Sequence, residues 1–343
     1  MRVAMYYNNR DVRLEEMATP RIGPGELLVQ IFASSICGSD IMEWYRIKRA
    51  PLVLGHEIAG RVAQVGEGVV GFCEGDRVVA THHVPCFNCH YCRSGHETVC
   101  DTLLEETHFD PGGFCEYVRL PAINVERGTW LLPDDVTYEI ATFVEPLACV
   151  FRGQKVAGIQ PGASVLVLGS GIAGLLHVKL ALAKGAGMVV ATDISNERRT
   201  LASQYGAHHV LPADSDVPQE FNNLNNGQGA DVVIVCATAE NVCRQAFQAV
   251  GRGGVILLFA PTPADTEVPL SINDVFWRRD VTVTTSYAAS PDDCVEALEF
   301  ISSKRVKVDD MITHRLGLAD TEKGFRLVEE GGASLKVIIK PQE

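Results

Sequence analysis

The chain has 343 residues, 46% hydrophobic and 21% charged, a composition typical of a globular protein with room for two domains. Its formal net charge of −13 disfavours nucleic acid as a partner, because binding a phosphate backbone requires clustered lysine and arginine. The N-terminal residues turn polar early and no long apolar run follows, so we expect no targeting or membrane segment and a cytoplasmic location. The expected partners are therefore small molecules.

The first third of the chain predicts a mostly β domain. Short apolar runs separated by glycine, proline and other turn residues are typical of a barrel or a sandwich of strands. The expected strands are residues 26–33, 58–65, 77–80 and 114–120.

From about residue 160 the pattern changes to buried apolar strands that alternate with helices. This alternation is typical of a parallel, doubly wound sheet. A helix over 291–303 and a last strand over 334–339 are expected to rejoin the first domain, so that one domain has residues 1–152 and 277–343 and the other has 153–276. The fold class is therefore α/β, with substrate and cofactor meeting between the domains. The expected strands of the second domain are residues 165–168, 189–192, 231–236 and 254–259.

Four closely spaced cysteines predict a structural zinc site. Two residues separate Cys86 from Cys89 and Cys89 from Cys92, and seven residues separate Cys92 from Cys100. Four thiolates in one polar loop suit the closed tetrahedral coordination of zinc, which leaves no position for a substrate. The chain has eleven cysteines and no expected export signal, which indicates a reducing compartment and favours metal binding over disulfides. His82 and His83 lie just before this run, but four thiolates leave zinc no vacancy for them.

A glycine-rich turn predicts a dinucleotide site. Gly169, Gly171 and Gly174 follow one predicted strand and open a helix over 175–184, the arrangement that holds a pyrophosphate at a helix N-terminus. Ile172 and Ala173 complete the turn. Asp193 ends the next strand, where a carboxylate accepts hydrogen bonds from the ribose hydroxyls and repels a 2′-phosphate. This favours NAD over NADP, and Arg198 is a candidate to lie over the adenosine.

A second, catalytic zinc is expected from ligands in separate turns. Cys37 and His56 supply one sulfur and one nitrogen, and Glu57 supplies an adjacent carboxylate. A catalytic zinc takes three protein ligands and keeps a fourth position open. Glu145, in an apolar segment, is a further candidate, although the segment alone does not distinguish a metal ligand from a carboxylate at a helix start.

These motifs together resemble the zinc-containing medium-chain dehydrogenase/reductase superfamily over nearly the entire chain. The resemblance rests on the run from Gly55 to Gly60, the glycines at 66, 71 and 75, the four-cysteine lobe, the turn at 112–114, the dinucleotide glycines and residues 336–338. It implies a GroES-like catalytic domain beside a Rossmann domain. Cys37 with Ser39 and Asp40, and Glu145 before Pro146, look like the sorbitol or polyol dehydrogenase branch.

The resemblance also implies roles for individual residues. Cys37 and His56 would bind the catalytic zinc, Glu145 would bind it directly or through water, and Glu57 would be an alternate ligand. Asp40 would accept a hydrogen bond from the free imidazole nitrogen of His56 and fix its tautomer. Ser39 would take the proton from the substrate hydroxyl.

One position departs from the family pattern. Many relatives have a histidine five residues after the zinc cysteine as the outer member of a proton relay, and this chain has Met42 there. The end of the relay therefore stays open. Family resemblance further implies that Ser286 approaches the nicotinamide and that a strand over 280–287 ends the Rossmann sheet and pairs across a two-fold axis, giving a homodimer or homotetramer.

The sequence thus predicts an enzyme with two zinc ions per subunit that oxidises a secondary alcohol, such as a polyol, cyclitol or sugar derivative, to a ketone and transfers hydride to NAD. An alternative in the same class is a threonine or amino-alcohol 3-dehydrogenase. An alternative in another class is a non-catalytic redox sensor that binds NAD and zinc. His108 is interpreted as a solvated loop histidine. The basic residues Arg46, Lys48 and Arg49 are interpreted as a solvated loop, and they leave an anionic substrate as the lesser alternative.

Overall fold

The computed structural model describes residues 1–263 and 266–343, and the chain divides into two compact units. Unit 1 consists of Met1–Ala148 and Ala288–Glu343, and unit 2 of Cys149–Tyr287. The limits expected from the sequence place residues 149–152 and 277–287 in the first domain instead. Residues 277–287 belong to unit 2 because β14 (Thr282–Thr285) pairs in parallel with β13 (Val250–Leu258).

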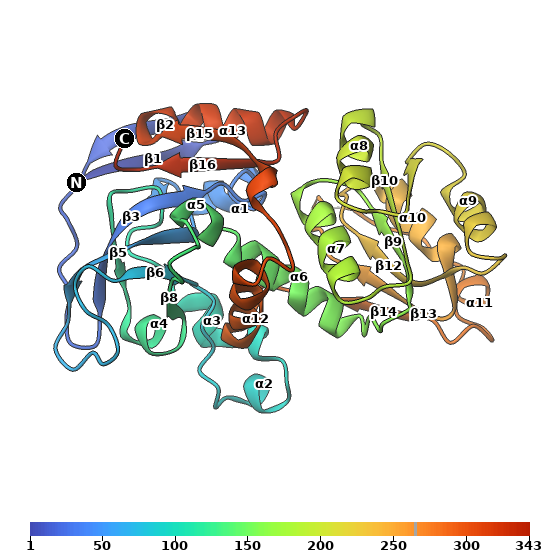
Figure 1. The fold of residues 1–343 in the computed structure, drawn as a ribbon, viewed down its shortest axis with the longest axis horizontal. Helices are drawn as coiled ribbons and strands as arrows, with labels where there is room; N and C mark the ends of the chain where they lie inside the picture. Colours follow the sequence, from blue (N-terminus) through green and yellow to red (C-terminus); the bar gives the residue numbers. More distant parts are fainter. Residues whose placement is uncertain (264–265) are drawn as a thin grey trace. The chain divides into compact units, whose positions relative to one another are not determined.

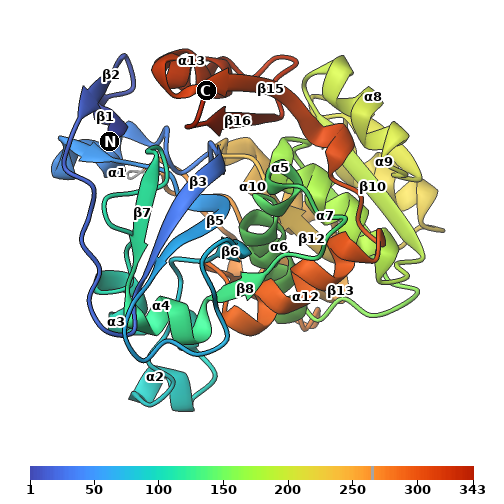
Figure 2. The ribbon, with the colours of Figure 1, turned by 60° about the vertical axis from the view of Figure 1, so that its left-hand side comes forward.

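Unit 1 is built on a mostly antiparallel sheet, as its short apolar runs predict. The strands lie in the order β15-β16-β3-β5-β6-β8, and β7 pairs with β3 (Figure 2). Because β16 pairs antiparallel with β3, the C-terminal segment rejoins the first domain as expected. The bounds are β3 Leu27–Ser35, β5 Glu57–Val65, β6 Arg77–Ala80, β7 Tyr117–Leu120, β8 Thr129–Leu131, β15 Ile312–Gly317 and β16 Lys336–Lys340.

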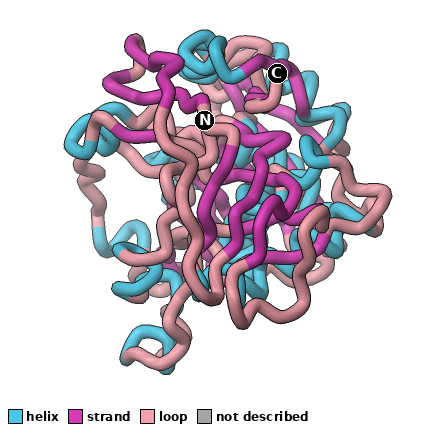
Figure 3. The backbone as a smooth tube through the Cα atoms, turned by 90° about the vertical axis from the view of Figure 1, so that its left-hand side faces the viewer, coloured by secondary structure: helices cyan, strands magenta, loops and turns pink. Residues whose placement is uncertain are grey.

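A smaller antiparallel sheet and short helices complete unit 1. The small sheet has the order β2-β1-β4. Both ends of the chain, marked in Figure 3, belong to this unit. The rings of Tyr6, Phe114 and Phe325 pack together in the core. The remaining strands and α-helices are β1 Arg2–Asn8, β2 Asp11–Glu16, β4 Leu52–Val53, α1 Glu43–Arg46, α2 His90–Arg93, α3 Asp101–Glu105, α4 Ala122–Arg127, α5 Tyr138–Ala141, α12 Pro291–Ser302 and α13 Thr321–Glu330.

Unit 2 is built on a parallel sheet in the order β11-β10-β9-β12-β13-β14. Counted along the chain this is the strand order 3-2-1-4-5-6 of a dinucleotide-binding fold, in which ligands bind at the carboxyl ends of the strands where the order reverses. The reversal falls between β9 (Ser164–Leu168) and β12 (Ala230–Val235). The other two strands are β10 Met188–Asp193 and β11 His209–Pro212.

The strands of this sheet are apolar and buried because helices cover both of its faces. Every residue of β9 is buried, which a strand covered on both faces requires. Figure 1 shows α7 (Ile172–Ala183) on one side of the sheet and α9 and α10 on the other. In the described residues no helix is both long and apolar enough to cross a membrane. The other α-helices of unit 2 are α8 Asn196–Gln204, α9 Val217–Leu224, α10 Glu240–Ala249 and α11 Ile272–Val275, and α6 Val144–Val156 begins in unit 1 and continues into unit 2.

Candidate functional site

The four cysteines of the 86–100 run lie together in a loop that contains α2 and projects from the sheet of unit 1 (Figure 2). The sulfur atoms of Cys89 and Cys92 are 3.5 Å apart, those of Cys100 and Cys86 are 3.5 Å apart, and those of Cys86 and Cys92 are 4.0 Å apart. Zinc–sulfur bonds of about 2.3 Å in a tetrahedron place the sulfurs roughly 3.8 Å apart. The cluster therefore fits a structural zinc.

The protonation of these thiols supports the same conclusion. Backbone N–H groups of Asn88 and Cys89 donate to Cys86 and lower the pKa of that thiol to about 6. Burial and the neighbouring thiols raise the pKa of Cys92 to about 12. Four thiolates so close together repel one another, so a bound cation is needed for all of them to ionise at neutral pH.

Pairing of β3 with β5 brings the first candidate catalytic ligands together. Ser35 at the end of β3 is opposite Glu57 at the start of β5, so Cys37, which follows β3, lies beside His56, which precedes β5. One ligand atom from each of Cys37, His56 and Glu57 lies within 4.8 Å of the other two. The set of one sulfur, one nitrogen and one oxygen donor suits a catalytic zinc.

Asp40 lies next to His56. Its carboxylate is fully buried, stands 3.4 Å from His56 Nδ1 and accepts a hydrogen bond of 3.0 Å from the backbone N–H of Cys37. Burial would raise the pKa of Asp40, but His56 and Arg46 outweigh it and the pKa is lowered. Burial would likewise lower the pKa of His56, but Asp40 and Cys37 raise it well above its usual value. A buried carboxylate against the imidazole is the arrangement that orients a metal-binding histidine.

Glu57 is held from the far side by Lys336. The Lys336 ammonium and the Ser35 hydroxyl both donate to Glu57 Oε2, and all three side chains are buried. The other oxygen, Oε1, is buried without a hydrogen-bond partner in the described part of the chain. A buried carboxylate oxygen requires a donor or a cation, so this atom supports a metal beside Cys37 and His56.

We predict that Lys336→Met lowers the free energy of unfolding by about 3 to 5 kcal/mol, because it leaves the buried Glu57 carboxylate without its partner. Urea unfolding followed by tryptophan fluorescence measures this change. Lys340→Met is the matched control, since Lys340 pairs with Glu343 near the surface and its loss should cost less than about 1 kcal/mol. Equal stability losses in the two variants would contradict the prediction.

Two histidines that the sequence did not place at the catalytic site also lie there. The ring of His82 is 4.9 Å from that of His56, and His83 Nδ1 is 3.4 Å from Glu145 Oε1. Ligand atoms of His82, His83 and Glu145 lie within 4.8 Å of one another, so the Glu145 carboxylate groups with these histidines. The signal in the sequence is that both histidines come just after the apolar run of β6, separated from it by Thr81, and β6 pairs with β5 beside His56.

Ser39 is held by Arg46. The Arg46 guanidinium donates to the Ser39 hydroxyl at 3.1 Å and to the Ser39 carbonyl at 2.9 Å, and lies 3.8 Å from Asp40. The side chain of Arg46 is only 18% exposed. Arg46 is therefore part of the site wall, which corrects its interpretation as a solvated loop residue.

The glycine turn follows β9 as predicted. Gly169 adopts φ +100°, which favours glycine, and a Cβ at Gly174 would lie 1.9 Å from the Gly169 carbonyl oxygen. Helix α7 begins at Ile172, one residue after Gly171, so its first N–H groups face the end of β9. This is the local geometry of a pyrophosphate site.

The other nucleotide candidates lie at the carboxyl ends of strands. Asp193, the last residue of β10, accepts from the backbone N–H of Ser170 at 2.9 Å and of Ser195 at 2.8 Å. The Arg198 guanidinium lies 3.5 Å from the Ser170 carbonyl, beside the glycine turn. The Ser286 hydroxyl, just beyond β14, is buried without a hydrogen-bond partner among the described residues.

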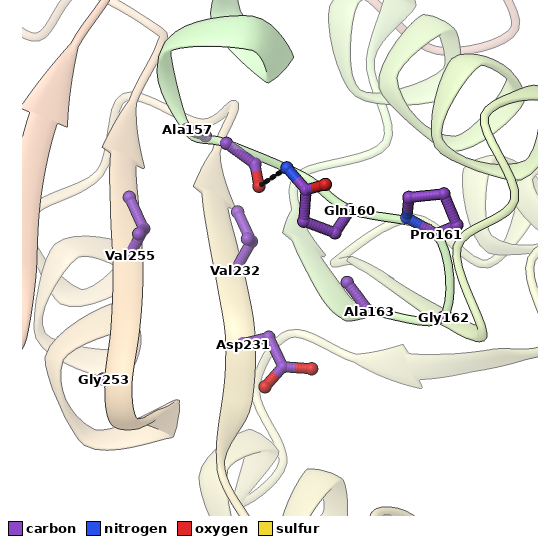
Figure 4. Close-up of a pocket in the computed structure, with 10 residues that line it drawn as sticks. Ala157, Gln160, Pro161, Gly162, Ala163, Asp231, Val232, Gly253 and Val255 are labelled. Atoms are coloured by element: carbon purple, nitrogen blue, oxygen red, sulfur yellow. Dashed lines mark hydrogen bonds between the residues drawn. The ribbon is translucent and has the colours of Figure 1, made fainter.

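A hollow of about 370 Å³ lies at the opposite end of this sheet (Figure 4). Ala163, Asp231 and Val232 line it at the amino ends of β9 and β12. The Asp231 carboxylate already accepts two hydrogen bonds of 2.8 Å from Ser164. Ligands of this fold bind at the carboxyl ends of the strands, so this hollow is not the nucleotide site.

Two family descriptions match the chain. The alcohol dehydrogenase GroES-like domain matches residues 23–133, and the zinc-binding dehydrogenase domain matches residues 173–303. An L-threonine 3-dehydrogenase from Pyrococcus furiosus is 34% identical over 93% of this chain and 92% of its own length. A sorbitol dehydrogenase from Gallus gallus is 30% identical over 96% of this chain and 93% of its own.

Solved structures of dehydrogenases share the fold of the chain. A zinc-binding dehydrogenase from Sinorhizobium meliloti, solved with NADP bound, has a TM-score of 0.88 and 26% identity over 99% of both chains. Galactitol-1-phosphate dehydrogenase from Escherichia coli has a TM-score of 0.88 and 25% identity, and covers 99% of this chain and 100% of its own.

Proposed function

The chain belongs to the zinc-dependent medium-chain dehydrogenase/reductase superfamily and is an enzyme of its alcohol dehydrogenase type, and from this premise we propose that it oxidises a secondary alcohol of the polyol, cyclitol or sugar class to a ketone with NAD. The observation that carries the proposal is the partly buried cluster of Cys37, His56 and Glu57, with the backbone N–H of Ser39 3.4 Å from Cys37 Sγ. The similarity of the chain to named dehydrogenases supports an enzyme over the redox sensor considered from the sequence.

Cys37 and His56 would hold the catalytic zinc, with Glu57 or Glu145 as the third ligand. Asp40 orients His56, and Lys336 restrains Glu57 through Oε2, which leaves Oε1 for the proposed metal. His83 lies against Glu145, where burial raises the pKa of the carboxyl but the hydrogen bond from His83 and the charges of His56 and Lys336 lower it overall. Glu145 is therefore ionised and suited to bind a cation.

When bound, zinc acts as a Lewis acid that lowers the pKa of the substrate hydroxyl, and NAD accepts the hydride. Ser39 would accept the hydroxyl proton. Arg46 occupies one lone pair of the Ser39 oxygen, which leaves its second lone pair and its own hydrogen for the substrate and for water. With Met42 at the outer relay position, the proton would leave Ser39 through water.

Asp193 would select NAD by accepting hydrogen bonds from the adenosine ribose. A carboxylate at this position repels the 2′-phosphate of NADP. The N–H groups of Ser170 and Ser195 hold it in place while leaving lone pairs for the ribose. The NADP in the Sinorhizobium meliloti relative makes this choice a matter for experiment.

We predict that Asp193→Asn raises the ratio of kcat/KM for NADP to that for NAD by about tenfold or more, because the repelling charge is lost. Initial rates with both cofactors measure the ratio. Asp214→Asn is the control, since Asp214 is an exposed carboxylate of the same unit. A ratio that stays the same in Asp193→Asn and in the control would show that Asp193 does not select the cofactor.

The proposal is tested by incubating the purified protein with NAD and a panel of polyols, cyclitols, threonine and simple secondary alcohols. Reduction of NAD is followed before and after treatment with a zinc chelator. Chelator-sensitive reduction with one polyol or cyclitol supports the proposal. Failure of every polyol and cyclitol, with zinc bound and another substrate active, contradicts it.

L-Threonine is the second candidate substrate. Relatives from Pyrococcus furiosus and Pyrococcus abyssi, both L-threonine 3-dehydrogenases, are 34% and 35% identical to the chain over 93% of its length. The sorbitol dehydrogenases are 29 to 30% identical. Because these values are so similar, threonine belongs in the first panel.

We also propose that the enzyme is a homodimer or homotetramer. Strand β14 is an edge strand of its sheet. The exposed side chains Trp277 and Tyr287 lie before and after this strand in the sequence. An uncovered strand edge with apolar neighbours is suited to pair with a second copy of the chain.

A further inference from the structure

We propose that the alcohol substrate carries an oxyanion, a phosphate monoester or a carboxylate, that is bound by the guanidinium groups of Arg46 and Arg49. This inference rests on the proposed function, because it concerns the substrate of the same site. It replaces the interpretation of this basic segment as a solvated loop. The group comprises Arg46, Lys48 and Arg49 in the segment of α1 and the short helix η1 (Ile47–Arg49), and His108 in a neighbouring loop.

The first observation is that this segment has more positive charge than its surroundings neutralise. The chain carries 43 acidic and 30 basic residues, yet three of the four residues 46–49 are basic. The acidic residue nearest in sequence, Glu43, accepts from the backbone N–H of Asn9. In the part of the chain that the structure describes, the side chains of Lys48 and Arg49 form no ion pair or hydrogen bond. An anion from outside would therefore find unpaired cations here.

The second observation is that Arg46 connects this segment to the reacting position. A guanidinium has five N–H donors, and Arg46 uses two of them on Ser39. Three donors remain, although the ion pair with Asp40 at 3.8 Å offsets part of the charge. Ser39 is the proposed acceptor of the hydroxyl proton. A substrate whose alcohol reacts at Ser39 can therefore place its own anionic group at Arg46.

The third observation is that Arg49 and Arg46 both lie close enough to His108 for their charges to act on its imidazole. Burial, then the positive charge of Arg49, then those of His83 and Arg46 lower the pKa of His108. Both arginines therefore act on one imidazole, which is exposed to solvent between the buried Thr107 and Phe109. At neutral pH the imidazole is an uncharged donor, while the arginines stay charged and supply the attraction.

Arginine suits this role for a chemical reason. Its planar fork donates two parallel hydrogen bonds to a phosphate or a carboxylate, and such charge-assisted bonds are stronger than neutral ones. The exposed aromatic ring of Trp44, next in the same segment, offers a face for the carbon chain of a sugar. An oxyanion is present both on phosphorylated polyols and on amino acids such as threonine. The experiment below distinguishes between these two classes of substrate.

The test compares matched substrates that differ only in charge. Galactitol 1-phosphate is compared with galactitol, and L-threonine with L-threonine amide, in the zinc-loaded enzyme with NAD. We expect kcat/KM to be higher for the anionic member of one pair. In Arg49→Gln we expect this preference to fall by about ten- to a hundredfold, the worth of a hydrogen bond to a charged group. Arg21→Gln, which removes an exposed arginine of the same unit, is the control and should keep the preference.

A binding measurement decides the matter even if no alcohol is oxidised. Calorimetric titration with inorganic phosphate should show binding to the wild type and to Arg21→Gln, and weaker binding to Arg49→Gln. Equal phosphate affinity in all three proteins, or an anionic preference that Arg49→Gln keeps, overturns the inference. Oxidation of neutral polyols without any anionic preference overturns it while leaving the proposed function intact, and silence of every alcohol contradicts the proposed function alone.

Discussion

Replacement of His56 by asparagine is expected to lower kcat/KM by at least about 10³, which corresponds to about 4 kcal/mol of lost transition-state stabilisation. His56 is the nitrogen ligand of the proposed catalytic zinc, and its imidazole lies against the buried Asp40 carboxylate. Without it, Cys37 and a single carboxylate remain to hold the metal. The substrate hydroxyl would then keep its ordinary high pKa, and proton loss to Ser39 would become unfavourable.

The measurement combines steady-state rates with metal analysis. The zinc content of His56→Asn should fall from two ions per chain to one, because the four-cysteine cluster is untouched. His209→Asn is the control, since His209 is exposed on β11 and contacts none of the proposed ligands. Full zinc content together with activity within tenfold of the wild type would remove His56 from the proposed metal site.

Replacement of Cys100 by serine is expected to lower the melting temperature by at least about 10 °C and to release one zinc ion per chain. Within residues 86–100, all of which the structure describes, only Thr98 and Cys100 are buried. Helix α2 has four residues, too few to be stable alone. A loop with so little apolar burial depends on its metal for its conformation.

Cys73→Ser is the matched control for this prediction. Cys73 is an exposed thiol of the same unit, outside the cluster. It should keep the wild-type melting temperature and both zinc ions. If Cys100→Ser loses one zinc ion and melts at the wild-type temperature, the cluster contributes nothing to folding and needs another explanation.

Much of the fold was predictable because its signals are local. The strand expected over 77–80 is β6 (Arg77–Ala80), and the parallel sheet of unit 2 follows from continuous runs of valine and leucine that only a doubly covered strand can bury. The glycine turn was predictable because its backbone conformation and close contacts are specific to glycine. The cysteine cluster was predictable because its ligands lie within fifteen residues of one another.

The parts that were missed depend on contacts between distant segments. Lys336 reaches Glu57 across 279 positions of the sequence, and no local pattern indicates that this lysine is buried. His82 and His83 were set aside because they neighbour the cysteines in sequence, whereas the pairing of β6 with β5 carries them to His56. In each case the sheet register decides which side chains meet.

The sequence by itself therefore determined the class of the protein: two kinds of domain, a four-cysteine lobe, a glycine turn of the dinucleotide-binding type and the residue types of the candidate metal site. Only the tertiary structure decided how the side chains combine. It placed Arg46 on Ser39, Glu145 with the two histidines and Lys336 behind Glu57. The physical reason is that backbone propensity and ligand spacing act over a few residues, whereas the charge and burial of a side chain depend on neighbours that only the folded chain supplies.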